Sequence, residues 1–287
     1  MNRQNRIALT ACAVVLWVAT PLRAQTAPSA VADTATAAAS TDSTPSAEDA
    51  RAGGQVIQKP EGPPPTPSHT GIKAMAKDLV EDFKHLPSRE NLFWASVSGG
   101  LALAVHPLDD NVNAHYAGRN PPGFFVLGKY LGEIYTLLPA AATVYVVGRV
   151  KDQPKITHVG MDLIEALAVN EALVQTIKYT TRRERPDGSG RNSFPSGHAA
   201  DTFAFATALE RHLGWKGAVP AYAFASYVAM SRLPDNKHWL SDVVFGAGVG
   251  IISGRTVTRH GKAFPVTLAP VPGGAAIMYV RHGATGQ

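Results

Sequence analysis

Cysteine is almost absent from this chain: Cys12 is the only one among 287 residues. It lies in an apolar run at 7–19, which follows two arginines and precedes the small residue Ala24. A charged start, a short apolar run and a small residue are typical of a secretory signal peptide, and the run is shorter than the roughly 20 residues of a transmembrane helix. We therefore predict a signal peptide at 1–24 and a mature chain without disulfide bonds or thiol chemistry.

Large apolar side chains are rare between residues 25 and 70, where alanine, threonine, serine and proline dominate. A segment of this composition cannot bury enough surface to offset the entropy lost on ordering. We predict a disordered spacer at 25–70, with polyproline character near its proline run at 63–67.

Long apolar runs are missing from the rest of the chain: no segment reaches 18 uninterrupted apolar residues, and several carry charges near their middle. This disfavours membrane-spanning helices and predicts an exported protein, periplasmic or in the cell envelope, that is soluble after signal cleavage. The formal net charge of +5 suits anionic ligands such as phosphates, and leaves peripheral membrane contact open. Nucleic acid is not expected as a partner, because no dense basic stripe is interleaved with aromatic residues. The sequence does not decide the oligomeric state.

The remaining pattern is helical. Apolar residues recur at steps of three and four from Ile72 to Leu86, with acids and bases mixed on the other face. Because these charges are mixed, we favour a helix that packs on the core over one that lies on a membrane. We predict an all-α bundle at 71–262 and, from two strand-like runs about a Pro/Gly turn, a β-hairpin tail at 263–287. Further apolar helical patterns lie at 91–105, 124–149, 158–180, 197–213, 217–231 and 238–258.

Three short segments each fit a phosphate site. In the first, Lys178 is followed seven residues later by Arg185 and then Pro186. Two cations at this spacing can face the same way on a helix, and Pro186 places Arg185 at a helix end, where its guanidinium can turn into a pocket. Taken alone, a solvated basic helix end is the better interpretation.

The second segment is Pro195-Ser196-Gly197-His198, which stands directly before a helical pattern. Ser196 can cap that helix, Gly197 lets the backbone approach a ligand closely, and the free N–H groups of a helix start attract anions. His198 would then stand beside the anion and deliver a proton. In isolation, an ordinary capped helix with an exposed histidine is the better interpretation.

The third segment contains Ser231, Arg232, His238 and Asp242. If a helix includes the last two, they lie four residues apart on one face, so the carboxylate can orient the imidazole as a base or nucleophile. The competing interpretation is a surface ion pair of little energetic consequence.

Together the segments resemble the type 2 phosphatidic acid phosphatase superfamily, which includes bacterial acid phosphatases, lipid phosphatases and vanadium haloperoxidases. The pattern of that superfamily is Lys-x6-Arg-Pro, Pro-Ser-Gly-His and Ser-Arg-x5-His-x3-Asp, and this chain meets it in full at 178–186, 195–198 and 231–242. The resemblance implies a compact multi-helix bundle of the acid phosphatase and vanadium haloperoxidase type.

The resemblance also implies a role for each residue. His238 would attack phosphorus, Asp242 would hold its ring, and His198 would protonate the leaving alcohol and later take a proton from water. Because three fixed cations can replace a metal, the expected activity is a metal-independent and cofactor-independent phosphatase that forms a phosphohistidine. Its substrates would be phosphate monoesters, with lipid phosphates and isoprenoid pyrophosphates among the candidates. The phosphoryl oxygens would be bound by Lys178, Arg185, Ser196, Gly197 and Arg232.

Two alternatives remain. A vanadium-dependent haloperoxidase would hold vanadate with the same residues. A non-enzymatic envelope scaffold would instead recruit a partner through the spacer and the tail.

Two further patterns are less informative. His106, Asp109, Asp110 and His115 could be imagined as a metal site, but we expect a surface loop there. The glycines at 246–250 do not match a dinucleotide fingerprint and indicate close helix packing.

Overall fold

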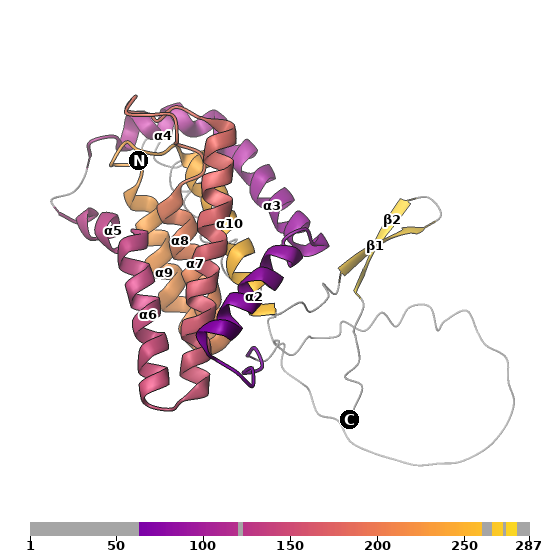
Figure 1. The fold of residues 1–287 in the computed structure, drawn as a ribbon. Coiled ribbons are helices and arrows are strands. Elements are labelled where there is room, and N and C mark those ends of the chain that lie inside the picture. The colour runs from indigo at the N-terminus through magenta and orange to yellow at the C-terminus, as the bar shows by residue number, and fades with distance from the viewer. Residues whose placement is uncertain (1–62, 120–122, 260–265, 272–273, 280–287) are drawn as a thin grey trace, which may run out of the picture.

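The computed structural model describes residues 63–119, 123–259, 266–271 and 274–279 (Figure 1). The predicted signal peptide and most of the predicted spacer lie outside these residues, and the part of the spacer at 63–70 contains neither helix nor strand. The body that follows is helical, which confirms the predicted all-α class. Its elements are α2 (Ile72–His85), α3 (Arg89–Val105), the 3-10 helix η1 (His106–Leu108), α4 (Asp109–Tyr116), α5 (Val126–Leu131), α6 (Ile134–Val150), α7 (Pro154–Thr181), α8 (Gly197–Leu213), α9 (Trp215–Ser231) and α10 (Leu240–Arg259).

Two helix boundaries differ from the predicted pattern in ways that affect the site. The apolar pattern at 124–149 is divided into α5 and α6, because Glu133 takes an extended conformation, with φ −74° and ψ 143°, directly before α6. The last long helix begins at Leu240, so His238 precedes α10 rather than lying on it.

Helices α7 and α8 run antiparallel along the centre of the bundle (Figure 1). Asn170 near the middle of α7 donates to Asp201 on α8 at 2.7 Å, and Asp162 near the start of α7 lies 2.9 Å from His212 near the end of α8. The end of α7 and the start of α8 therefore meet at one end of the bundle. The end of α9 and the start of α10 lie there too, beside α4 (Figure 1).

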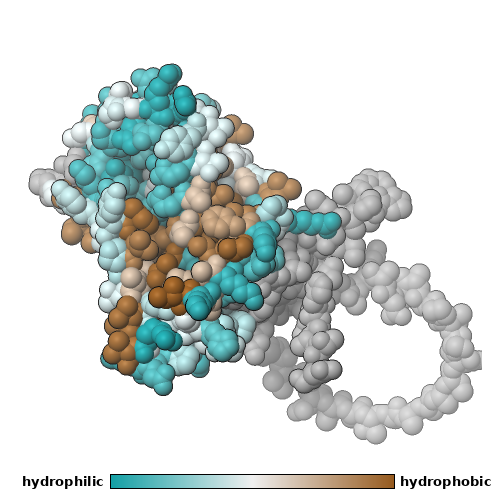
Figure 2. Space-filling view, viewed as in Figure 1, coloured by the Kyte–Doolittle hydropathy of each residue, from teal (hydrophilic) through white to brown (hydrophobic). Residues whose placement is uncertain are grey.

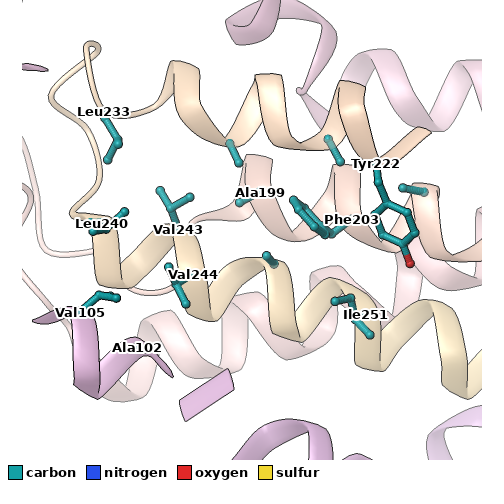
Figure 3. Close-up of a cluster of buried hydrophobic side chains, with 14 of the residues drawn as sticks. Ala102, Val105, Ala199, Phe203, Tyr222, Leu233, Leu240, Val243, Val244 and Ile251 are labelled. Carbon is teal, nitrogen blue, oxygen red and sulfur yellow. The ribbon is translucent and has the colours of Figure 1, made fainter. Parts of the chain in front are cut away.

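The largest group of buried apolar side chains lies where α8, α9 and α10 meet α3 (Figure 3). Phe203, Val243 and Ala225 are at most 1% exposed. Each fully buried side chain of the size of valine or phenylalanine contributes about 1.5–3 kcal/mol to stability. A second group fills the space between α6, α7 and α8 around Leu163 and Leu167.

Glycines allow α10 to approach α8 closely, as the sequence predicted. A Cβ atom on Gly250 would lie 2.2 Å from the carbonyl oxygen of Ala200, and one on Gly246 would lie 2.5 Å from that of Ser196. Both distances are too short for a side chain. Gly246 therefore fixes α10 against the turn that carries the predicted phosphate-binding serine.

Helix α2 packs on the bundle with only part of the face that its apolar pattern predicts. Leu79 and Leu86 contact the second core group, but Phe83 is 40% exposed and Ile72 is 74% exposed. The side chain that α2 buries is Asp82, which is 2% exposed.

The two strands follow the helical body. Strands β1 (Val266–Val271) and β2 (Gly274–Tyr279) pair antiparallel, with Val266 opposite Tyr279 and Val271 opposite Gly274. They occupy the segment for which the sequence predicts a hairpin.

Candidate active site

His238 lies in the loop before α10 and is 3% exposed. Its Nδ1 donates to the backbone carbonyl of Ser193 at 2.7 Å, whereas the nearest oxygen of Asp242 is 3.8 Å away. A carbonyl can only accept, so Nδ1 carries the proton and Nε2 presents a lone pair. Burial lowers the pKa of His238, which keeps the ring neutral.

Asp242 accepts hydrogen bonds from two residues that lie next to His238 in space, Ser193 and Trp239. Its Oδ2 accepts from Ser193 Oγ at 2.5 Å and from the Trp239 backbone N–H at 2.8 Å. The sequence led us to expect a direct contact between Asp242 and the ring, based on a helix that contains both. Because α10 begins after His238, the carboxylate lies 3.8 Å from Nδ1, and its shorter contact is with Ser193, whose carbonyl accepts from the ring.

Arg183 connects this carboxylate to α4, a link that the sequence did not reveal. Its guanidinium donates to Asp242 Oδ1 at 2.6 Å and to Asp109 Oδ2 at 2.7 Å. Asp109 also accepts from the backbone N–H and the hydroxyl of Ser241, at 2.9 and 2.6 Å. The predicted surface loop is therefore wrong for Asp109, which is 3% exposed and begins a helix.

His198 lies in the first turn of α8, as predicted. Its Nε2 is 3.1 Å from the carbonyl oxygen of Lys129 and 3.2 Å from Glu133 Oε1, both of which only accept. Burial, reinforced by the positive charge of Arg232, lowers the pKa of His198 to about 3. The ring is therefore neutral at neutral pH, and a negative charge placed nearby would raise its pKa.

The start of α8 has the features of an anion site. Ser196 occupies the N-cap position, but its hydroxyl makes no capping bond to the helix. The residue is fully buried, and no described residue hydrogen-bonds to its Oγ. Lys178 Nζ lies 3.5 Å from the point where a Cβ on Gly197 would stand, so the cation and the helix start face the same space. Both favour a bound anion.

The two predicted arginines keep unused donors in the interior. Arg232 is 5% exposed and donates to Asp235 at 2.7 Å through Nη1, while its buried Nε has no hydrogen-bond partner among the described residues. The buried Nε of Arg185 is likewise without one within the described part of the chain. Burial, followed by the charge of Arg185, lowers the pKa of Lys178. Repulsion between these cations is relieved when an anion binds between them.

Two cavities adjoin these residues. One, of about 340 Å³, opens beside Lys178 and is polar, with Arg182 and Arg191 in its wall. The other, of about 320 Å³, lies beside Arg183 and is mainly apolar, with Leu103, Phe194 and Phe245 in its wall.

These features describe a helical protein with a candidate anion site that brings together two buried histidines and three cations. Residues 159–264 match the model of the PAP2 superfamily, so this segment is similar to members of that superfamily. The matched segment contains all the site residues that the sequence predicts.

Two curated proteins are similar to parts of the chain. The Lipid A 1-phosphatase of Porphyromonas gingivalis is 43% identical over 91 residues, which are 31% of this chain and 20% of that protein. A putative phosphatidate phosphatase of Drosophila melanogaster is 37% identical over 157 residues, 48% of this chain and 40% of that protein. The chain thus spans between a fifth and two fifths of the length of these relatives.

Two solved structures are also similar. Aquifex aeolicus LpxE has a TM-score of 0.45 and 24% identity, over 53% of this chain and 95% of that one. The first transmembrane PAP2 type phosphatidylglycerolphosphate phosphatase from Bacillus subtilis has a TM-score of 0.46 and 18% identity, over 64% of this chain and 92% of that one.

The expectation of a protein that is soluble after signal cleavage is wrong. The Bacillus subtilis protein is transmembrane, and within the described residues α10 is long and apolar enough to cross a membrane, although 89% of that span is buried in the bundle. The expectation rested on charges within apolar segments. Two of these charged residues, Asp162 and Asp201, form hydrogen bonds to neighbouring helices inside the bundle. Their presence in the sequence therefore says nothing about the polarity of the outer surface.

The outer surface carries many large apolar side chains (Figure 2). On α6, Tyr135 is 85% exposed, Val146 is 53% exposed and Val150 is 79% exposed. Hydrophilic residues gather instead at the end of the bundle near α4 (Figure 2). The site lies at this hydrophilic end.

Proposed function

We propose that this chain is a phosphatase that transfers the phosphoryl group of a phosphate monoester to His238 and then to water. The observation that carries the proposal is a set of three buried donors, Ser196 Oγ, Arg185 Nε and Arg232 Nε, with no hydrogen-bond partner among the described residues. Buried polar groups without partners are costly. A tetrahedral phosphate offers each of these donors an acceptor oxygen.

In the first step, Nε2 of His238 forms a bond to phosphorus as the bond from phosphorus to the alcohol oxygen breaks. The Ser193 carbonyl holds the Nδ1 proton, and Asp242 holds Ser193, so the imidazolium that forms stays oriented. The leaving oxygen takes a proton from His198. Although the pKa of His198 is about 3 in the free site, the dianionic phosphoryl group raises it and the Glu133 carboxylate supports the protonated form.

In the second step, His198, now neutral, accepts a proton from a water molecule that attacks phosphorus. The bond from phosphorus to His238 Nε2 breaks, and inorganic phosphate leaves. Lys178, Arg185 and Arg232 stabilise the charge on the equatorial oxygens in both steps. These fixed cations take the role that a metal ion has in many phosphoryl transfers, which supports a metal-independent reaction.

We propose a lipid phosphate as the substrate. The two curated relatives are named for lipid A and phosphatidate. The apolar cavity beside Arg183 supports the same class, because an acyl chain can lie there while a phosphate occupies the cationic site. The polar cavity beside Lys178 suits a headgroup with further anionic groups.

The test compares phosphate release from phosphatidate, lipid A and an aryl phosphate, in detergent and in the presence of a metal chelator. We expect release in chelator, inhibition by vanadate and faster turnover of a lipid than of the aryl phosphate. With labelled substrate and an acid-free quench, the label should be recovered on His238.

The matched control is His85→Ala, which removes an exposed histidine from α2 and should leave turnover and labelling unchanged. Oxidation of halide with vanadate and peroxide, without phosphate release, would establish the haloperoxidase alternative instead. A protein that is folded but neither releases phosphate nor becomes labelled would support the scaffold.

A further inference from the structure

A second cluster of ionisable residues lies at the opposite end of the α7–α8 pair. His158 Nε2 is 3.2 Å from Asp162 Oδ1, and His212 Nε2 is 2.9 Å from Asp162 Oδ2. The three ligand atoms lie within 4.8 Å of one another. All three side chains are at most 6% exposed. The two rings meet edge to face, with centroids 4.9 Å apart. Each directs its Nε2 at the same carboxylate, that of Asp162.

This cluster is remote from the proposed catalytic site. Asp162 precedes Lys178 by 16 residues on one continuous helix, which corresponds to about 24 Å at 1.5 Å per residue. His212 is similarly separated from His198 along α8. The cluster therefore has no part in the phosphoryl transfer proposed above.

Two further carboxylates are buried around the cluster. Glu165 is fully buried one turn after Asp162 on α7, and neither of its oxygens has a hydrogen-bond partner among the described residues. Asp162 and Asp82 are the charged groups that act most strongly on it. Asp82 enters from α2, and its Oδ2 is also buried with no partner in the described part of the chain.

The position of Asp82 is informative because α2 buries this acidic side chain and leaves the neighbouring Phe83 partly exposed. A rotation that buried the neighbouring Phe83 would remove apolar surface from water, yet Phe83 is 40% exposed and Asp82 is 2% exposed. Acidic residues are almost never fully buried unless they are paired or bind a metal. A ligand for Asp82 at this position would account for the orientation of the helix.

We propose that His158, Asp162 and His212 bind a divalent transition metal ion of the zinc class, with Glu165 and Asp82 completing or supporting its coordination. Two imidazoles and a carboxylate are a ligand set that zinc favours, at bond lengths of about 2.0–2.2 Å. A tetrahedral ion with such bonds spaces its ligand atoms by about 3.4 Å. The observed separations of 2.9 and 3.2 Å need only a small expansion.

The bound ion would have a structural role. It would join α2 to α7 and α8 at one end of the bundle. Three acidic side chains are buried there among the described residues: Asp82, Asp162 and Glu165. A divalent cation would supply the positive charge and the bonding partners that the oxygens of Glu165 and Asp82 lack. The competing account is an ionic network of these side chains in which no metal binds.

The test uses the full chain, purified without a histidine tag. After dialysis against a chelator, ZnCl2 is titrated by calorimetry, and thermal unfolding is followed with and without zinc. We expect one zinc ion per chain and a higher unfolding midpoint with zinc. Asp162→Asn and His212→Ala should each weaken zinc binding by at least about 100-fold, whereas His85→Ala on α2 and His238→Ala in the proposed catalytic site should bind zinc normally.

If a variant fails to fold, measurements on the wild-type protein alone still decide between the two accounts. X-ray absorption at the zinc edge should show two imidazole ligands together with oxygen ligands. Absence of zinc binding by the wild type, a spectrum without imidazole, or unchanged affinity in Asp162→Asn would each overturn the proposal in favour of the ionic network.

Discussion

The two ends of the α7–α8 pair place different unsatisfied polar groups in the same interior. At the end near α4, Lys178, Arg185 and Arg232 surround His198 and His238 with buried donors that lack acceptors. At the other end, the described carboxylates leave buried acceptors that lack donors, and two histidines are again present. The same side chain, histidine, thus stands in two environments that favour ligands of opposite sign.

The difference shows that a buried histidine acquires its chemistry from its neighbours. His238 is held by a carbonyl, stays neutral and faces cations, which suits attack on a phosphoryl group. His212 faces the carboxylate of Asp162, which suits coordination of a metal ion. Separate effects of variants at the two ends are the clearest test of this contrast.

The largest expected effect is on turnover at the cationic end. His238→Ala should lower kcat by at least about 10,000-fold and cost only about 1–2 kcal/mol of stability, because the nucleophile is lost together with one buried hydrogen bond. His212→Ala should do the reverse, since it removes a partner of buried Asp162 and should destabilise the protein by about 3 kcal/mol. Parallel assays of phosphate release and thermal unfolding check both. Loss of turnover in a folded His212→Ala protein would contradict the separation.

The next effect concerns Arg183, which joins Asp242 to Asp109. Arg183→Ala should lower kcat by about 100-fold, because Asp242 no longer holds Ser193 and the His238 ring in place. It should also cost about 2 kcal/mol of stability, less than for a fully buried pair because the Arg183 side chain is 25% exposed.

Arg182→Ala is the matched control for kcat: it removes a neighbouring, exposed arginine of the polar cavity wall, which should affect KM rather than kcat. Steady-state kinetics and denaturant unfolding measure both quantities. Equal losses of kcat in the two variants would show that Arg183 acts only through the local positive charge.

The sequence predicted the central helices because they depend on local patterns, and local motifs also supplied the candidate site residues, whose roles remain proposals. Helix α8 has the predicted bounds, since its start is marked by Ser196 and Gly197 and its end by Gly214. The predicted contact between Asp242 and the His238 ring differs in the structure because it depended on a helix boundary two residues away. Boundaries are the least certain part of a periodicity argument.

Contacts between distant segments left no local signal. Arg183 is hidden in a basic run, and its partner Asp109 is 74 residues earlier in the chain. Asp82 lies at the edge of the apolar face of α2, three residues after Leu79, and an acidic side chain there gives no sequence signal of burial. Both depend on how helices are placed against one another, which the three-dimensional structure alone provides.

A smaller effect separates two neighbouring serines. Ser196→Ala removes a hydroxyl that has no partner among the described residues, so stability should change by less than about 0.5 kcal/mol while kcat/KM falls about 10-fold. Ser193→Ala removes a hydroxyl that donates to buried Asp242 and should cost about 1–2 kcal/mol of stability. Kinetics and unfolding of both variants measure the contrast. A large stability loss in Ser196→Ala would mean that its hydroxyl serves the fold.

The smallest expected effect is a fraction of a proton taken up when an anion binds. The pKa of His198 is about 3 in the free site, and a dianion beside it should raise that pKa. Between the two pKa values the ring is neutral when free and protonated when bound, so binding takes up protons and weakens as pH rises through the bound-state pKa.

Sulfate is a suitable probe because it remains a dianion across this range. Calorimetric titrations in buffers of different ionisation enthalpy count the protons, and His198→Ala should abolish the uptake while retaining weaker sulfate binding through the three cations. Uptake that persists in His198→Ala would assign the proton to another group. His198 could then act only as the base of the second step, and the proton for the leaving alcohol would have to come from elsewhere.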